Sequence, residues 1–340
     1  MCVWSAYAGS GRAGEILWES LKKIEGVWGG FYTGLVTLDR GAFHPGKVLG
    51  NTRIWREHWN PADFPGTAGL IHSRTDSGGD SRWSHPFLGS GGKVALVSQG
   101  SSGIFRENHK DFERMGNLLL REGKTFASAD PSAVHPGYPR LEDGTCVHCS
   151  EVSAAAVEYY YEKLHDPVAA IRRAFEQLPE EASSIILFAD LPGVIGFVNM
   201  NQRIVWQRTS GGVLLSLSTL AFPAPCATEI PGNSVGVISP DSLRIEPLAD
   251  RFNVDSTLPE GMYAASLEYV REHPGCHIAH LTDNVLRPHF PQGVLNYRIV
   301  AAYRILEMLL LEKRVVLRES EVAGKSGMPG RVFLIWPAEG

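Results

Sequence analysis

The first hundred residues alternate short apolar runs with stretches rich in glycine and other turn-forming residues. Three such runs predict β-strands: residues 31–38, 68–72 and 93–98. Residues 13–24 differ, because Ile16, Leu17, Leu21 and Ile24 recur at helical spacing. The pattern therefore predicts a β-α-β beginning.

The middle of the chain changes from helices back to strands. Residues 151–164 are rich in alanine, glutamate and tyrosine, and residues 167–178 follow with Asp166 at an N-cap position, so a helical pair is predicted. Apolar segments between residues 183 and 247 are separated by Gly, Asp, Asn or Pro, which predicts a second sheet. Two antiparallel sheets with helices against them form an α+β layered domain of about 250 residues.

The last ninety residues have a different pattern. After a linker near residues 249–259, helices are predicted at 260–273, 277–286 and 295–312. Two apolar strands around a glycine-rich tip follow, an order that favours a winged-helix-like module over a helical cap on the main domain. We therefore expect domains at residues 2–250 and 258–340.

Composition and charge limit the class of protein. The chain has 340 residues, 44% of them hydrophobic, and a formal net charge of −5. No apolar run approaches the roughly 18 to 20 residues that span a bilayer, and the N-terminus lacks the pattern of a signal peptide. We expect a cytoplasmic protein without a membrane partner. The mild acidity argues against nucleic acid as a partner of the whole chain, and leaves it open only for the C-terminal module.

The cysteines and glycines give no sign of a metal or cofactor. Five cysteines, an odd number, are typical of reduced thiols. Cys146 and Cys149 have CxxC spacing, but no second pair follows them, so no metal ion is predicted. No GxxxxGK[ST] phosphate-binding motif occurs, and no cofactor is predicted.

Cys2 is a candidate nucleophile. A small residue at position two favours removal of Met1, after which Cys2 would carry both a thiol and a free α-amine. The amine has a reference pKa near 8 and can accept the thiol proton close to neutral pH. A structural cysteine is the alternative on this evidence alone.

Two strand ends carry further candidate residues. Arg74 ends an apolar strand, where its guanidinium can bind a carboxylate through two hydrogen bonds. Gln99 and Gly100 end another, where a side-chain amide and a backbone N–H can stabilise an oxyanion. A plain strand and turn is the alternative there.

Several motifs occur in a familiar order. Met-Cys is followed by an amphipathic helix and then by GGFYTGLVTLD, GLIHSRT, SHPF and VALVSQG. This order resembles the glutaminase domain of class II glutamine amidotransferases, such as the one in glucosamine-6-phosphate synthase. The resemblance covers about residues 2 to 247.

The resemblance implies a fold and a mechanism. The fold is a four-layer αββα N-terminal-nucleophile sandwich, in which Cys2 attacks the glutamine carboxamide and releases ammonia through a thioester. Arg74 matches the arginine that holds the substrate carboxylate, and His72 and His85 lie in the matching substrate-binding motifs. Gln99 and Gly100 match the Asn-Gly pair of the oxyanion hole, with glutamine in place of asparagine.

The acidic segment that binds the substrate ammonium also departs from the family pattern. Asp130 is the favoured candidate, because an ammonium in a low-dielectric pocket needs a carboxylate. A later alignment places Cys149 at the aspartate position. Asp143 and Glu151 remain alternatives.

These features predict a stand-alone glutaminase. It would release ammonia from glutamine or a γ-glutamyl amide, with an ammonia-accepting enzyme as a possible partner. The alternative, motivated by Gln99 and the altered acidic segment, is a catalytically weak sensor that binds an amide or amino acid and acts through its C-terminal module.

Overall fold

A computed structural model provides the structure. It describes residues 1–100, 109–132, 138–178, 180–224, 227–248, 258–289, 297–325 and 327–338. The expected linker lies mostly outside these residues, so the proposed domain boundary is not observed directly.

Seven antiparallel strands form the first sheet, in the order β11-β9-β10-β1-β4-β2-β3. The strands are β1 (Val3–Gly9), β2 (Tyr32–Asp39), β3 (Ala42–Leu49), β4 (Ala68–Arg74), β9 (Val205–Thr209), β10 (Gly212–Ser216) and β11 (Thr228–Glu229). Helix α1 (Ala13–Ile24) packs on β1 and β4, and α2 (Thr52–His58) packs beside β3. The predicted β-α-β beginning is confirmed.

Six antiparallel strands form the second sheet, in the order β13-β12-β8-β7-β6-β5. The strands are β5 (Phe87–Leu88), β6 (Val94–Gly100), β7 (Ala182–Phe188), β8 (Ile195–Asn199), β12 (Ser234–Ile238) and β13 (Leu243–Pro247). The predicted helical pair is also confirmed. Helices α5 (Cys149–Leu164) and α6 (Pro167–Gln177) pack on this sheet, and α4 (His109–Arg121) packs against α5. The Asp166 side chain caps α6 by accepting a hydrogen bond from Ala169 N at 2.9 Å.

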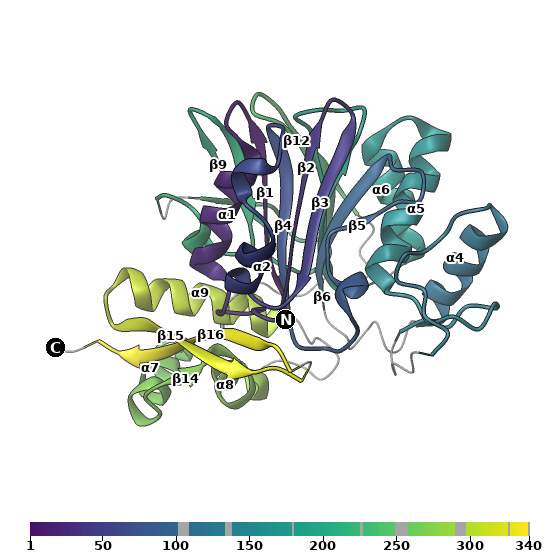
Figure 1. Cartoon of the computed structure of the whole chain (residues 1–340). Coiled ribbons are helices and arrows are strands. Elements are labelled where there is room, and N and C mark those ends of the chain that lie inside the picture. The colour runs from purple at the N-terminus through teal and green to yellow at the C-terminus, as the bar shows by residue number, and fades with distance from the viewer. Residues whose placement is uncertain are drawn as a thin grey trace.

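Successive side chains of the second sheet contribute alternately to two apolar cores, one on each face of the sheet. On β6, Ala95 and Val97 belong to the core shared with the first sheet, whereas Val94 and Leu96 belong to the core under the helices. This alternation follows from the two-residue period of a strand. In Figure 1, α1 lies on one side of the strands and α5 and α6 lie on the other.

Residues 258–338 pack at the end of the strands where the N-terminus lies (Figure 1). They form α7 (Met262–Glu272), β14 (Cys276–His277), α8 (Ile278–His280), a π-helical turn (Leu281–Leu286), a 3-10 turn (Arg287–His289), α9 (Tyr297–Leu311), β15 (Val315–Ala323) and β16 (Pro329–Pro337). The three strands form one sheet in the order β14-β16-β15. The helix expected at 277–286 differs in part, because His277 pairs with Leu334 of β16.

A buried ion pair joins α9 to the first sheet. Arg203 donates to both carboxylate oxygens of Glu307, at 2.8 and 2.9 Å. The Ser218 hydroxyl and the Thr219 N–H donate to the same carboxylate, at 2.6 and 2.9 Å. The Arg203 and Glu307 side chains are only 7% and 11% exposed, so water contributes little to their hydrogen bonding.

We expect Glu307→Ala to lower the free energy of unfolding by about 3 to 5 kcal/mol, because the buried Arg203 loses both hydrogen bonds to a carboxylate and keeps only a 3.9 Å contact with Glu229. Urea denaturation of the purified protein measures this loss. Arg53→Ala serves as the control, since Arg53 is 64% exposed in its pair with Glu319 and should contribute less than about 1 kcal/mol. Equal losses in the two variants would contradict the prediction.

Candidate active site at the strand ends beside the N-terminus

The strand register brings Cys2 next to Arg74. Strand β1 runs antiparallel to β4, with Val3 opposite Ser73, so Cys2 and Arg74 lie on neighbouring strands at the same end of the sheet. Hydrogen bonds link this end to the second sheet. Trp4 Nε1 donates to Ser183 Oγ at 3.2 Å, and Ser183 Oγ donates to Gln99 Oε1 at 3.3 Å. Cys2, Arg74 and Gln99 are therefore brought together from β1, β4 and β6.

The N-terminal residue contacts the candidate oxyanion hole. Met1 Sδ accepts a hydrogen bond from Gln99 Nε2 at 3.7 Å, and the Met1 carbonyl accepts one from Gly29 N at 3.0 Å. Burial lowers the pKa of the Met1 α-amine, and the Cys2 thiol partly offsets this. Cys2 is half-buried with a free thiol. The amide donor of Gln99 is thus directed at the start of the chain.

Gly100 lies where β6 and β7 come close together. Its residue partner across the strands is Ala182. A Cβ at position 100 would lie 2.7 Å from the Glu181 carbonyl oxygen, so a larger residue would push the two strands apart. Gly100 itself is exposed.

Arg74 is a buried cation with an unused donor. Its side chain is 2% exposed, its guanidinium lies over the Tyr32 ring at 4.7 Å, and Nη1 donates to the Gly78 carbonyl at 3.0 Å. Within the described part of the chain, Nη2 has no hydrogen-bond partner. Buried donors are normally satisfied, so this nitrogen is suited to a ligand carboxylate.

The two expected substrate-binding histidines are buried and neutral. The His72 and His85 ring centroids are 4.0 Å apart, and His148 lies 5.3 Å beyond His85. Burial lowers the pKa of His72 to about 3 and that of His85 well below its ordinary value. His72 Nε2 hydrogen-bonds the Ser98 carbonyl at 3.1 Å and so joins the sheets. Neither ring nitrogen of His85 has a partner among the described residues.

Asp130 is engaged at the surface. Its carboxylate accepts from Arg82 Nη2 at 3.3 Å and from Ser132 Oγ at 2.7 Å, and its side chain is 22% exposed. Asp143, also exposed, accepts from the N–H and the hydroxyl of Thr145 at 2.9 and 2.7 Å. Both carboxylates therefore already have hydrogen-bond partners within the chain, and neither offers an unused oxygen dedicated to a ligand ammonium.

The remaining two candidates for ammonium binding are buried. Glu151 accepts from Ala127 N at 2.7 Å and from Ser128 N and Oγ at 2.8 and 2.5 Å, which ties the loop before α5 to that helix. Burial raises the pKa of Glu151. Cys149 is the first residue of α5, and burial raises the pKa of its thiol well above the ordinary value. Burial thus favours the neutral form of the Cys149 thiol.

Three further residues near the site were missed in the sequence. Burial raises the pKa of Tyr138, while the charge of Arg74 and a side-chain hydrogen bond with Arg74 oppose that rise and the charge of Cys2 adds to it. Burial likewise raises the pKa of Tyr303 on α9, which lies within electrostatic reach of Cys2. The third is Glu180, which is buried before β7. The apolar spacing of residues 295–312 indicated only packing, so nothing in the sequence pointed to Tyr303.

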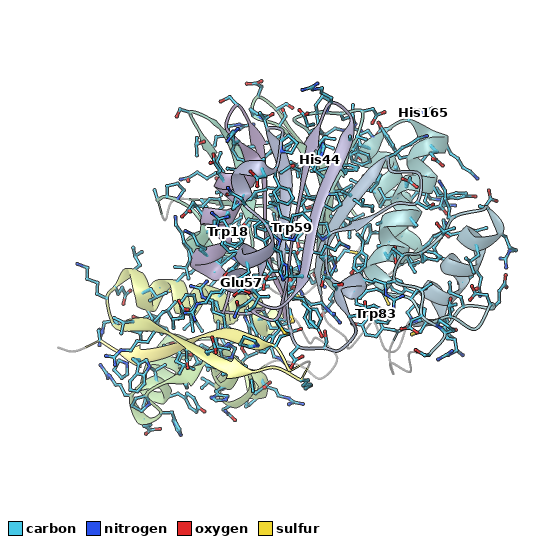
Figure 2. All side chains as sticks on the ribbon, in the orientation of Figure 1. Trp18, His44, Glu57, Trp59, Trp83 and His165 are labelled. Atoms are coloured by element: carbon cyan, nitrogen blue, oxygen red, sulfur yellow. The ribbon has the colours of Figure 1, made fainter. Side chains whose placement is uncertain are left out.

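An aromatic side chain borders this end of the sheets. Trp83, labelled in Figure 2, lies at the end of the strands where the N-terminus is found in Figure 1. Its ring packs edge-on against Tyr138 at 5.0 Å and His148 at 5.6 Å. These rings supply an apolar wall of low dielectric, in which charge–charge contacts are strengthened.

The described residues hold no group of three or more His, Cys, Asp or Glu side chains that could bind a metal ion. Cys146 and Cys149 are both buried as free thiols. In the same described part of the chain, no helix is long and apolar enough to cross a membrane.

No protein-family model and no curated protein sequence matches the chain. Two solved structures are similar to it, each with a TM-score of 0.57 over 81% of this chain and 53% of the other. One is glutamine phosphoribosylpyrophosphate amidotransferase from B. subtilis, complexed with ADP and GMP, at 14% identity. The other, at 15% identity, is described as the allosteric regulatory enzyme of purine biosynthesis. The chain spans about half the length of these proteins. Its fold, mixed α and β with antiparallel sheets, is one found in glutamine amidotransferases.

Proposed function

We propose that this chain is a class II glutaminase that releases ammonia from L-glutamine or another γ-glutamyl amide through a thioester at Cys2. The observation that supports this most is Arg74, a buried guanidinium with an unused donor beside Cys2. In this proposal residues 2–250 form an αββα N-terminal-nucleophile domain. Helices α1, α5 and α6 are its outer layers and the two sheets are its inner layers.

The proposed mechanism begins with removal of Met1, which frees the α-amine of Cys2 and withdraws the Met1 sulfur from Gln99. The amine accepts the thiol proton, and the sulfur attacks the carbonyl carbon of the substrate amide. Gln99 Nε2 and the Gly100 N–H then donate to the oxyanion. When the C–N bond breaks, ammonia leaves with the proton held by the amine. Water hydrolyses the thioester and gives the γ-carboxylate product.

In addition to the reacting groups, the proposed site contains a residue that orients the substrate. Arg74 can hold the substrate α-carboxylate through two charge-assisted hydrogen bonds, which fixes the position of the distal amide relative to Cys2. His72 and His85, both neutral, add no competing charge. In this proposal they shape the pocket wall.

Residues 258–340 are proposed to form a winged-helix-like module, because helix, short strand, helical turns, helix and two long strands follow in that order. Tyr303 of α9 lies within electrostatic reach of Cys2, so this module would also border the site. We propose that an ammonia-accepting enzyme in the cytoplasm uses the product.

The test is ammonia release by purified protein whose N-terminus at Cys2 has been verified by mass spectrometry. We expect release from L-glutamine, and assays of larger γ-glutamyl amides such as γ-glutamylanilide define how wide the pocket is. Protein that still carries Met1 serves as the matched control and should be inactive, because it lacks the free amine base. If the processed protein binds glutamine but releases no ammonia, the catalytic proposal fails and the sensor alternative replaces it.

A further inference from the structure

A cavity lies where the C-terminal strands β15 and β16 meet helices α1 and α2 (Figure 1). Its volume is about 320 Å³, at the lower end of the range for small-molecule sites. Four of its lining residues are cations and one is a carboxylate. The lining residues are Trp18, Lys22, Thr52, Arg53, Arg56, Glu319 and Arg331. The proposed mechanism uses none of them.

The carboxylate that lines the cavity is shared between two arginines. Glu319 accepts from Arg53 Nη2 at 2.5 Å and from Arg331 Nη2 at 2.9 Å. Burial works against ionisation of Glu319, but the hydrogen bond from Arg331 and the charges of both arginines lower its pKa. The cavity is therefore an environment that favours negative charge.

The other cations have no carboxylate partner within the cavity lining. Among the described residues, Arg56 donates only to a backbone carbonyl, at 3.0 Å. Lys22 pairs with Glu19 at 2.7 Å and Arg53 also pairs with Glu321 at 3.3 Å, but neither of these carboxylates lines the cavity. Within the lining itself, cations therefore outnumber carboxylates by four to one.

Arg331 is held in place by both parts of the chain. Its side chain is 12% exposed, and Nη1 donates to the Lys22 carbonyl in the last turn of α1 at 2.9 Å. Its backbone N–H donates to the Gly30 carbonyl at 3.0 Å. A Cβ on Gly30 would lie 2.0 Å from the Arg331 carbonyl oxygen, so the strand and this loop are in close contact. Arg331 is thus ordered without a ligand, which reduces the entropy lost when a ligand binds.

We propose that this cavity binds a small organic phosphate monoester. At neutral pH a phosphate monoester carries about 1.5 to 2 negative charges and three acceptor oxygens. The guanidinium groups of Arg56 and Arg331 and the ammonium group of Lys22 supply matching donors. The ring of Trp18 supplies apolar surface for the carbon skeleton of the ester. Because these residues lie outside the proposed catalytic machinery, the assignment does not depend on the proposed function.

Isothermal titration calorimetry of the whole chain tests this site with three probes. Phenyl phosphate carries the ring and the phosphate group, benzenesulfonate carries the same ring with one negative charge, and inorganic phosphate has no ring. We expect one molecule of phenyl phosphate to bind per chain, about tenfold more tightly than benzenesulfonate because of its greater charge. It should also bind about tenfold more tightly than inorganic phosphate, because its ring is removed from water.

Two variants should change the Kd for phenyl phosphate in opposite directions, which general damage to the fold would not do. Arg56→Met should raise the Kd about tenfold, because a cation is lost from the cavity. Glu319→Gln should lower it about threefold, because a competing carboxylate is removed. Arg40→Met is the matched control: its side chain is 92% exposed and does not line the cavity, so the Kd should not change. Melting curves without ligand show that each variant is folded.

The proposal is overturned if the folded wild type does not bind phenyl phosphate, or if Arg56→Met binds it as tightly as the wild type. Arg74→Met separates this cavity from the candidate active site and should keep the wild-type Kd. Loss of binding in Arg74→Met would place the ligand at the candidate active site and overturn the assignment. Equal affinity for inorganic phosphate and phenyl phosphate would indicate a site for the bare anion and overturn the choice of an ester.

Discussion

Cys2→Ala is expected to reduce ammonia release from L-glutamine by about 10⁴-fold or more, because the variant cannot form the thioester through which both half-reactions pass. A coupled assay that detects glutamate and ammonia measures this loss. The oxyanion donors and Arg74 remain, so the variant should still bind L-glutamine with near wild-type affinity. Loss of turnover with retained binding is the expected signature of a missing nucleophile.

Cys276→Ala provides the control for general loss of a thiol, since Cys276 is a buried thiol of β14 that the proposed mechanism does not use. It should retain wild-type turnover. A glutamine-like electrophile should label the wild type once, on the Cys2-containing peptide, and should not label Cys2→Ala. Equal turnover in wild type and Cys2→Ala would rule out Cys2 as the nucleophile.

Arg74→Met should lower kcat/KM for L-glutamine by about 10³-fold, chiefly through KM, because the substrate carboxylate loses both charged hydrogen bonds in a water-poor pocket. Methionine keeps most of the side-chain length over Tyr32. Steady-state kinetics measure the effect, and Arg74→Lys should recover only part of the loss, since lysine cannot form the two-pronged contact.

The stability of the same variant gives an independent check. No carboxylate among the described residues pairs with Arg74, so Arg74→Met removes a buried charge without leaving another behind. Its melting temperature without ligand should therefore fall only slightly, through loss of the hydrogen bond to the Gly78 carbonyl, while the stabilisation by L-glutamate that we expect for the wild type should disappear. An unchanged KM for L-glutamine would show that Arg74 does not bind the carboxylate.

The sequence predicts well the strands whose ends carry Arg74 and Gln99. The runs that end at Arg74 and Gln99 are apolar on both faces, so their boundaries are clear and the polar residues after them are conspicuous. Strand β3 was not predicted, because Pro45 and Gly46 interrupt its pattern. The structure places β3 at the edge of the sheet, where proline is tolerated.

The burial and hydrogen bonding of individual polar side chains are harder to predict from the sequence than the strands are. Glu180 and Glu181 occur in a short polar stretch that is typical of a surface turn, yet both are buried in the structure. The hydrogen bond between the His72 ring and the Ser98 carbonyl could not be read from the sequence either. Burial of a polar group depends on contacts between segments far apart in the chain, which residue spacing does not encode.

Strand β1 lies in the middle of the first sheet, so the proposed removal of Met1 has to occur before that sheet has formed. In the folded chain the Met1 amine is buried, so an aminopeptidase must act before β1 is enclosed. One neighbour of β1 is β4, but the other is β10, which is synthesised about 200 residues later. At roughly 5 to 20 residues per second, the ribosome leaves the N-terminus accessible for about 10 to 40 seconds. The fraction of active protein in a cell would thus depend on the competition between methionine removal and translation, and rapid overproduction would yield chains that retain Met1.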